Sequence, residues 1–114
     1  MPERLSDLDP DVQTMLRELM QDDYNSLLQT FLQDTDRRLC QLHESLDRNN
    51  WEGFRQAAHS FKGSCGNMGA LALTKACQQA EEAASLADAE AATQVCDLID
   101  RLCLRLRPQL TCTH

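Results

Sequence analysis

The residues best suited to chemistry lie in one short stretch that begins at His59. The imidazole of histidine is a nucleophile and a proton carrier near neutral pH. Three of the four glycines in the chain, Gly63, Gly66 and Gly69, follow it within a window of seven residues. Gly63 falls in a segment with helical periodicity, where glycine costs about 1 kcal/mol relative to alanine. We therefore expect this glycine to meet a requirement other than helix stability.

A helical wheel places His59 on the outside of its helix. With Trp51 at zero and about 100° per residue, the apolar side chains cluster near about 280–360°, whereas His59 falls at about 80°. Arg55 and Lys62 flank it at about 40° and about 20° as candidate cations. Lys62, three residues on, can reach an anion attached to the imidazole. Gly63, one turn beyond His59, leaves the space above the ring open to an approaching partner.

The rest of the chain has the composition and periodicity of helices. Aromatic residues make up 4%, and only four glycines and three prolines interrupt the chain. Apolar residues recur at three- and four-residue steps, and Asp9, Asn50 and Asp88 precede such stripes as helix N-caps. The pattern predicts five helices: a short one from Asp9-Pro10, a long one over 23–47, a third from Asn50 to the glycines at 66–69, a fourth over about 70–86, and a fifth from Asp88 that ends at Pro108.

These helices are expected to form one all-α domain. Short connections between long amphipathic helices favour antiparallel neighbours. We predict an antiparallel up-down-up-down four-helix bundle with a short extra N-terminal helix laid across it. The domain would span residues 1–114, with a helical core at about 9–107 and a flexible tail at 108–114.

Charge and hydropathy exclude several kinds of partner. The formal charge of −7 argues against nucleic acid, whose phosphates need a basic surface. No run approaches the roughly 18 apolar residues of a membrane span, and no apolar stretch resembling a signal peptide follows Met1. We expect no membrane association and a cytoplasmic location. His43 and His114 are interpreted as solvated surface groups.

Six cysteines raise the question of a metal site or of disulfides. None of them forms the close C-x2-4-C pair that builds zinc sites. Most fall on apolar helix positions, where a free cysteine is a small hydrophobe. We therefore expect no bound metal.

The stretch at 59–70 resembles the signature of histidine phosphotransfer (HPt) domains. It has a histidine, a lysine three residues on, glycine and serine directly after, and a closing Gly-Ala. The resemblance implies that His59 accepts a phosphoryl group, that Lys62 supports this group and that Gly63 keeps the docking surface open. It also implies that Ser64 helps to hold the helix or a phosphoryl oxygen.

A further site residue is implied on the helix that follows. HPt domains often carry a glutamine there that orients the imidazole, and Glu81 stands at the matching position. A carboxylate can accept a proton from a ring nitrogen, and it would also repel a phosphoryl group. The resemblance therefore leaves open whether Glu81 orients His59 or belongs to the solvent face.

The resemblance implies a phosphorelay carrier. Such a protein takes a phosphoryl group from the receiver-domain aspartate of a hybrid sensor kinase and passes it to the receiver of a response regulator. It acts as a monomer and needs no cofactor of its own, since the partner receiver holds Mg²⁺. The sequence has no Gly-rich nucleotide loop, P-loop or kinase motif, so we expect a phosphocarrier and not an enzyme. From the start at Met1 and the end soon after the last helix we expect a stand-alone bacterial HPt protein.

Two other functions remain open. A helical scaffold or binding module could keep the fold without being phosphorylated, although it would need neither His59 nor Lys62. An enzyme could use His59 as a general base oriented by Glu81. The predicted bundle offers no visible substrate cleft and no second catalytic group on the same face, which speaks against an enzyme.

Overall fold

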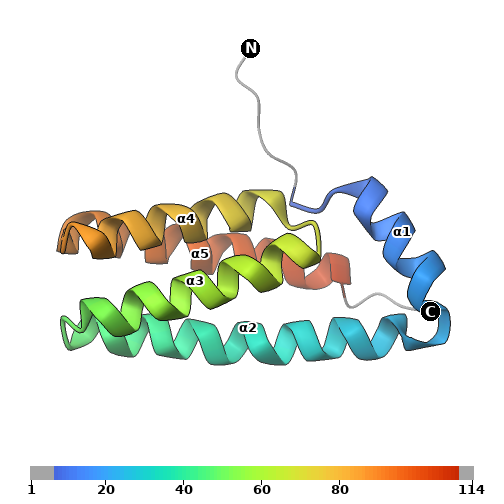
Figure 1. Cartoon of the computed structure of the whole chain (residues 1–114), viewed down its shortest axis with the longest axis horizontal. Coiled ribbons are helices and arrows are strands. Elements are labelled where there is room, and N and C mark those ends of the chain that lie inside the picture. The colour runs from blue at the N-terminus through green and yellow to red at the C-terminus, as the bar shows by residue number, and fades with distance from the viewer. Residues whose placement is uncertain (1–6, 111–114) are drawn as a thin grey trace, which may run out of the picture.

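Helices make up nearly all of the chain that the structure describes, which is residues 7–110 of a computed structural model. Along the chain come α1 (Pro10–Met20), a single 3-10 turn η1 (Gln21–Asp23), α2 (Tyr24–Asp47), α3 (Trp51–Asn67), α4 (Leu71–Ser85) and α5 (Ala89–Leu110) (Figure 1). No strand occurs within residues 7–110. The predicted all-α class is confirmed.

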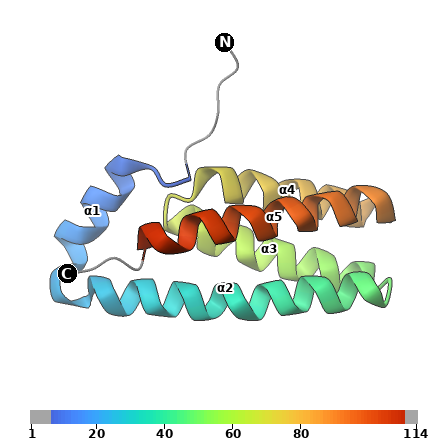
Figure 2. The ribbon, with the colours of Figure 1, turned by 180° about the vertical axis from the view of Figure 1, so that it is seen from behind.

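Helices α2 to α5 lie side by side in one bundle, and successive helices are joined at alternate ends (Figures 1 and 2). Helix α1 lies at an angle beside the end of the bundle where α2 begins and α3 ends. Helix α3 packs most extensively on α4 and also contacts α2. It therefore has a neighbour on two sides and keeps a further face for solvent.

Side-chain caps fix where three of the helices begin. An oxygen of Asp9 accepts a hydrogen bond from a backbone N–H at 3.0 Å in the first turn of α1. Asn50 does the same at 3.0 Å for α3, and Asp88 at 3.0 Å for α5. Each cap satisfies a backbone donor that has no partner within its own helix. These three predicted helix starts are confirmed.

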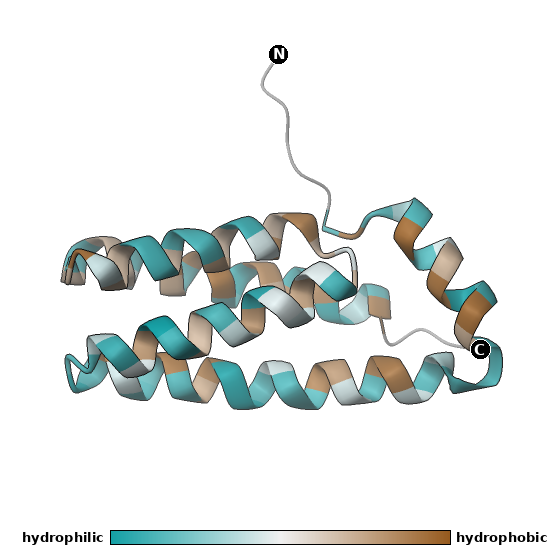
Figure 3. Ribbon diagram, in the orientation of Figure 1, coloured by the Kyte–Doolittle hydropathy of each residue, from teal (hydrophilic) through white to brown (hydrophobic). Residues whose placement is uncertain are grey.

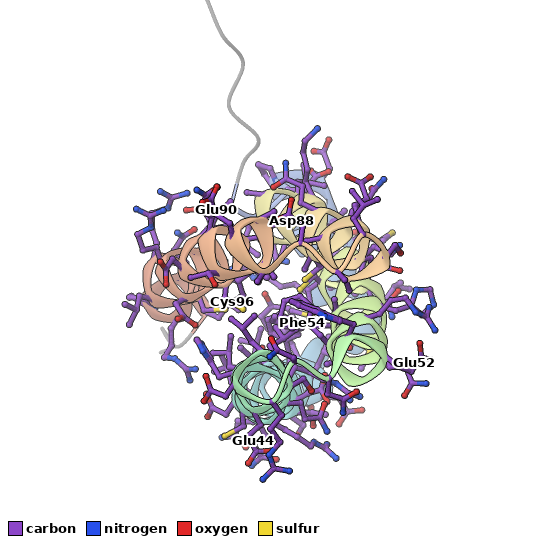
Figure 4. All side chains as sticks on the ribbon, turned by 90° about the vertical axis from the view of Figure 1, so that its left-hand side faces the viewer. Glu44, Glu52, Phe54, Asp88, Glu90 and Cys96 are labelled. Atoms are coloured by element: carbon purple, nitrogen blue, oxygen red, sulfur yellow. The ribbon has the colours of Figure 1, made fainter. Side chains whose placement is uncertain are left out.

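The bundle core is apolar and contains many alanines beside its larger side chains. Its largest fully buried side chains include Phe54, Phe61, Leu42, Leu73 and Ile99. Figure 4 looks along the bundle and shows Phe54 pointing between the helices, whereas Glu44 and Glu52 point outward. Hydrophilic and hydrophobic residues follow one another along every helix (Figure 3). No helix in the described part of the chain is long and apolar enough to cross a membrane.

The end of α5 differs from the prediction. The sequence pattern predicts a stop at Pro108, but the helix continues to Leu110. Leu106 and Leu110 are buried, with 4% and 3% of their surface exposed. Burying a leucine contributes about 1.5–3 kcal/mol, which is comparable to the roughly 3 kcal/mol that a proline inside a helix costs. Packing thus carries the helix past Pro108, and residues 111–114 lie outside the described chain.

Helix α1 is attached to the turn that ends α3. The buried side chain of Gln13 donates from Nε2 to the carbonyl oxygen of Met68 at 2.6 Å. The backbone N–H of Asp9 donates to the carbonyl oxygen of Gly69 at 2.8 Å. Gly69 has a φ of +73°, and a Cβ at this position would lie 2.8 Å from the Cβ of Val12. The turn therefore requires glycine on both grounds.

The described cysteines are free thiols, and all of them except Cys40 are buried. Burial is the largest cause that raises the pKa of Cys96 and of Cys103 to about 12. These thiols are protonated at neutral pH and pack as small apolar groups. Within residues 7–110 no three His, Cys, Asp or Glu side chains come together as metal ligands. Cys112 lies outside the described residues.

Candidate functional site

His59 lies on the solvent face of α3. The helix buries Phe54, Phe61 and Cys65 against the bundle. The imidazole projects from the other side, and its side chain is 66% exposed. This is the outward orientation that the helical wheel predicts. A ring so exposed can be reached by another protein.

A carboxylate from the neighbouring helix holds one edge of this ring. Glu81 on α4 places Oε2 3.0 Å from Nδ1 of His59 and Oε1 2.5 Å from Nζ of Lys62. An ionised carboxylate can only accept hydrogen bonds, so Nδ1 donates this one. In the neutral ring the free lone pair is then on Nε2, at the far side of the ring from Glu81. The contact therefore selects the nitrogen that can act as a nucleophile.

Glu81 is ionised at neutral pH. Its side chain is 18% exposed, and its Oε1 is inaccessible to water. Burial by itself would raise the pKa of this carboxyl, but the hydrogen bonds from Lys62 and His59 and the charges of both groups hold it below its ordinary value. The carboxylate is thus a fixed negative charge between an ammonium group and an imidazole.

Glycines keep the surface beside His59 low. A Cβ built at Gly63 or at Gly66 would meet no atom within 4 Å. Packing in the bundle therefore does not require either glycine. Positions four and seven residues beyond His59 lie on the same face of the helix. The two glycines leave open space on that face.

Comparison with known proteins identifies the family. The family model of the Hpt domain matches residues 26–107. The chain belongs to the Hpt domain family. A search of curated proteins finds no match.

A solved HPt structure is similar over nearly the whole chain. It is the crystal structure of histidine-containing phosphotransfer protein B from Pseudomonas aeruginosa, with a TM-score of 0.89 and 34% sequence identity. The match covers 94% of this chain and 93% of that chain. HPt proteins are phosphocarriers that interact with receiver domains. The role of the present chain is accordingly histidine phosphotransfer in a phosphorelay.

Two of the predicted site residues, Arg55 from the helical wheel and Ser64 from the HPt signature, are paired with residues other than His59. Arg55 donates from Nη2 and Nε to the carboxylate of Glu52, at 2.8 and 3.3 Å. The hydroxyl of Ser64 donates to Oδ2 of Asp34 on α2, at 3.2 Å. Ser64 thus links α3 to α2. The resemblance implies that Ser64 holds either the helix or a phosphoryl oxygen, and this contact corresponds to the first role.

The contact between Lys62 and Glu81 is not foreseen by the sequence analysis. The helical wheel of α3 shows only that Lys62 lies near His59. Its partner on α4 depends on how far one helix is shifted along the other, and spacing within a single helix does not report this shift. The same limit hides Asp34 as the partner of Ser64. Only the family resemblance singles out Glu81.

A second histidine and carboxylate pair joins α2 to α5. Nε2 of His43 lies 3.1 and 3.0 Å from the two carboxylate oxygens of Asp100. The two side chains are 46% and 40% exposed. His43 is at the surface, as predicted, but it is paired and not merely solvated. His114 lies outside the described residues.

Proposed function

We propose that the protein accepts a phosphoryl group on Nε2 of His59 from the receiver-domain aspartate of a hybrid sensor kinase and passes it to the receiver of a response regulator. The observation that carries this proposal is the bond between Nδ1 of His59 and Glu81. It leaves the lone pair on Nε2 of a ring that is 66% exposed. A scaffold that is not phosphorylated has no need of such a tautomer.

The chemistry needs little from this chain. The lone pair of Nε2 forms a bond to phosphorus while the bond from phosphorus to the aspartyl oxygen breaks, and the electron pair of that bond stays on the carboxylate. The transition state is loose and in line, so positioned cations stabilise it. Mg²⁺ on the partner receiver supplies part of this charge.

Lys62 supplies the cation on the HPt side. An ammonium group has three N–H donors. The group forms an ion pair with Oε1 of Glu81 at 2.5 Å, and its donors can also reach phosphoryl oxygens. Glu81 thus anchors the flexible lysine beside His59, and Lys62 offsets the repulsion between Glu81 and a phosphoryl group. The arrangement supports the proposal that Glu81 orients His59.

The partner is proposed to be a protein and not a small molecule. His59 is on an outer helix face with open space over Gly63 and Gly66. An exposed site on a helix face suits a modest, transient interface of less than about 1,200 Å². We propose further that the protein acts as a monomer in the cytoplasm and holds no cofactor of its own.

Label transfer tests this function. The purified protein is incubated with a phosphorylated receiver domain, and acid-labile label is followed on wild type, His59→Gln and His43→Gln. We expect wild type and His43→Gln to be labelled equally and His59→Gln to stay unlabelled, with the same circular dichroism for all three. Acid-labile label on His59→Gln would refute the site. Absence of label on folded wild type from a broad panel of receivers would favour the scaffold.

A further inference from the structure

We propose that Glu81 is a positioning residue whose negative charge, in addition to its hydrogen bond, promotes the release of the phosphoryl group from His59. This inference rests on the proposed function and deepens it. Orienting the ring requires only a hydrogen-bond acceptor at Nδ1. A glutamine oxygen would provide that acceptor, so the charge of Glu81 needs an explanation of its own.

The charge that the ring carries before and after transfer provides this explanation. Neutral His59 keeps its proton on Nδ1 and uses the lone pair of Nε2 to bind phosphorus, so the phosphorylated ring carries a positive charge. When the group moves on, the bond from Nε2 to phosphorus breaks and its electron pair returns to Nε2. An aspartyl oxygen of the receiver forms the new bond. The leaving group is then neutral imidazole, and no proton has to move.

Loss of the Nδ1 proton would change this outcome. The phosphorylated ring would then be neutral, and its leaving group would be an imidazolate anion, which leaves far less readily. Outward transfer therefore requires that Nδ1 stays protonated. Glu81 acts on this atom directly, since its Oε2 lies 3.0 Å from Nδ1.

The position of the carboxylate favours attraction over repulsion. Glu81 touches the edge of the ring that carries Nδ1, whereas a phosphoryl group would sit beyond Nε2 on the opposite edge. Its attraction to the ring cation thus acts over a shorter distance than its repulsion of the phosphoryl group. Low exposure strengthens both interactions. Lys62 at 2.5 Å from the other carboxylate oxygen reduces the repulsion further.

Other charges near the ring do not substitute for Glu81. On α3, Arg55 is directed to Glu52, and Lys62 has the sign that disfavours a ring cation. On α4, Glu82 is exposed and makes no contact with the ring; it borders the groove toward α5 with Arg101 and also the hollow that Lys62 and Glu81 line. On α2, the charged group that contacts α3 next to this region is Asp34, whose carboxylate is shared by Ser64, Arg37 and Arg38.

Three substitutions separate charge from orientation. Glu81→Gln keeps an acceptor of nearly the same size and removes the charge. Glu81→Asp keeps the charge on a shorter side chain. Glu82→Gln removes one negative charge from the neighbouring exposed position and is the matched control. Each variant is phosphorylated, isolated and mixed with excess receiver, and the single-turnover rate of transfer is measured from about pH 6 to about pH 9.

We expect Glu81→Gln to slow outward transfer about tenfold at the alkaline end, because an opposite charge this close changes the balance between charged and neutral forms by about that factor or more. The loss should be smaller near pH 6, because the higher proton concentration favours the protonated ring in both variants. Glu82→Gln should follow the wild-type profile throughout, and Glu81→Asp should lie closer to wild type than Glu81→Gln does.

Equal pH profiles for wild type and Glu81→Gln would overturn the inference and leave Glu81 with orientation alone. So would a loss in Glu81→Gln that is the same at every pH. The proposed function is tested separately, by the acid-labile labelling of wild type and its absence in His59→Gln. If that labelling occurs and the pH profiles coincide, only the inference about Glu81 fails.

Discussion

Two histidines of this bundle make nearly the same contact and are placed for different purposes. In each pair a ring nitrogen lies about 3.0 Å from a carboxylate of another helix, for His59 with Glu81 and for His43 with Asp100. His59 uses Nδ1, whereas His43 uses Nε2. The outer nitrogen of His59 is thus free, and the nitrogen left over in His43 is the one next to its own backbone.

The surroundings of the two rings differ as well. Three and four residues after His59 come Lys62 and Gly63, a cation and open space. Three residues after His43 comes the uncharged Leu46 in place of a cation, and four residues after it comes the negatively charged Asp47 in place of glycine. A histidine paired with a carboxylate is therefore not by itself a phosphotransfer site. The choice of ring nitrogen, the nearby cation and the low surface distinguish His59.

Among the residues near His59, loss of the cation Lys62 should reduce phosphoryl transfer most. We expect Lys62→Ala to slow phosphoryl transfer about 10- to 100-fold, because a charge-assisted hydrogen bond of about 1.5–3 kcal/mol is lost and Glu81 then faces the phosphoryl group without compensation. Transfer to one chosen receiver, quenched at successive times, would measure the rate. Lys75→Ala, which removes the other lysine, is the control. Equal rates for both variants would contradict a role of Lys62.

Filling the open space should have the next largest effect. We expect Gly63→Gln to slow transfer about tenfold, equivalent to about 1.4 kcal/mol of lost docking free energy. The fold should gain stability, since glycine inside a helix is unfavourable by about 0.5–1 kcal/mol and no atom obstructs a Cβ there. Gly63→Ala should show the gain in stability with little loss of rate. Unfolding in urea and single-turnover transfer would report the two effects, and a Gly63→Gln protein that transfers as fast as wild type would argue against an access role.

The smallest expected effect is on the free energy of unfolding, and it compares the carboxylates of Glu81 and Asp100. The pKa of Glu81 is lowered in the folded protein, so its ionised form stabilises the fold above the unfolded value of about 4.5 and this stabilisation is lost as the pH falls through the lower, folded value. At pH 7 we expect Glu81→Gln to destabilise by about 0.5–1 kcal/mol and Asp100→Asn by about 0.2–0.5 kcal/mol. Both variants change the net charge equally. Urea unfolding at pH 7 and at about pH 3 would measure this, and a deficit of Glu81→Gln that persists in acid would contradict it.

Local features of the fold and site were predictable from the sequence. The caps Asp9, Asn50 and Asp88 depend only on their own backbone neighbours. The exposure of His59 depends only on the periodicity of α3. Each of these features is decided within one helix, where the spacing of residues fixes their relative direction.

Features that depend on two helices were not predictable in this way. The contact of Lys62 with Glu81 and that of Ser64 with Asp34 require the relative shift of packed helices. The continuation of α5 past Pro108 requires the burial of Leu110 against the bundle. The burial of leucines offsets the local preference for a helix end at Pro108.

The attachment of α1 has a consequence for how this family member can vary. Val12 occupies the space that any side chain at position 69 would need, and the positive φ of Gly69 disfavours side chains independently. A smaller residue in place of Val12 would remove the clash but not the backbone strain. The effects of substitutions at these two positions are therefore non-additive. Substitution of Gly69 is therefore less costly in a background in which the side chain at position 12 is already smaller, so the order in which the two mutations arise changes the stability of the intermediate.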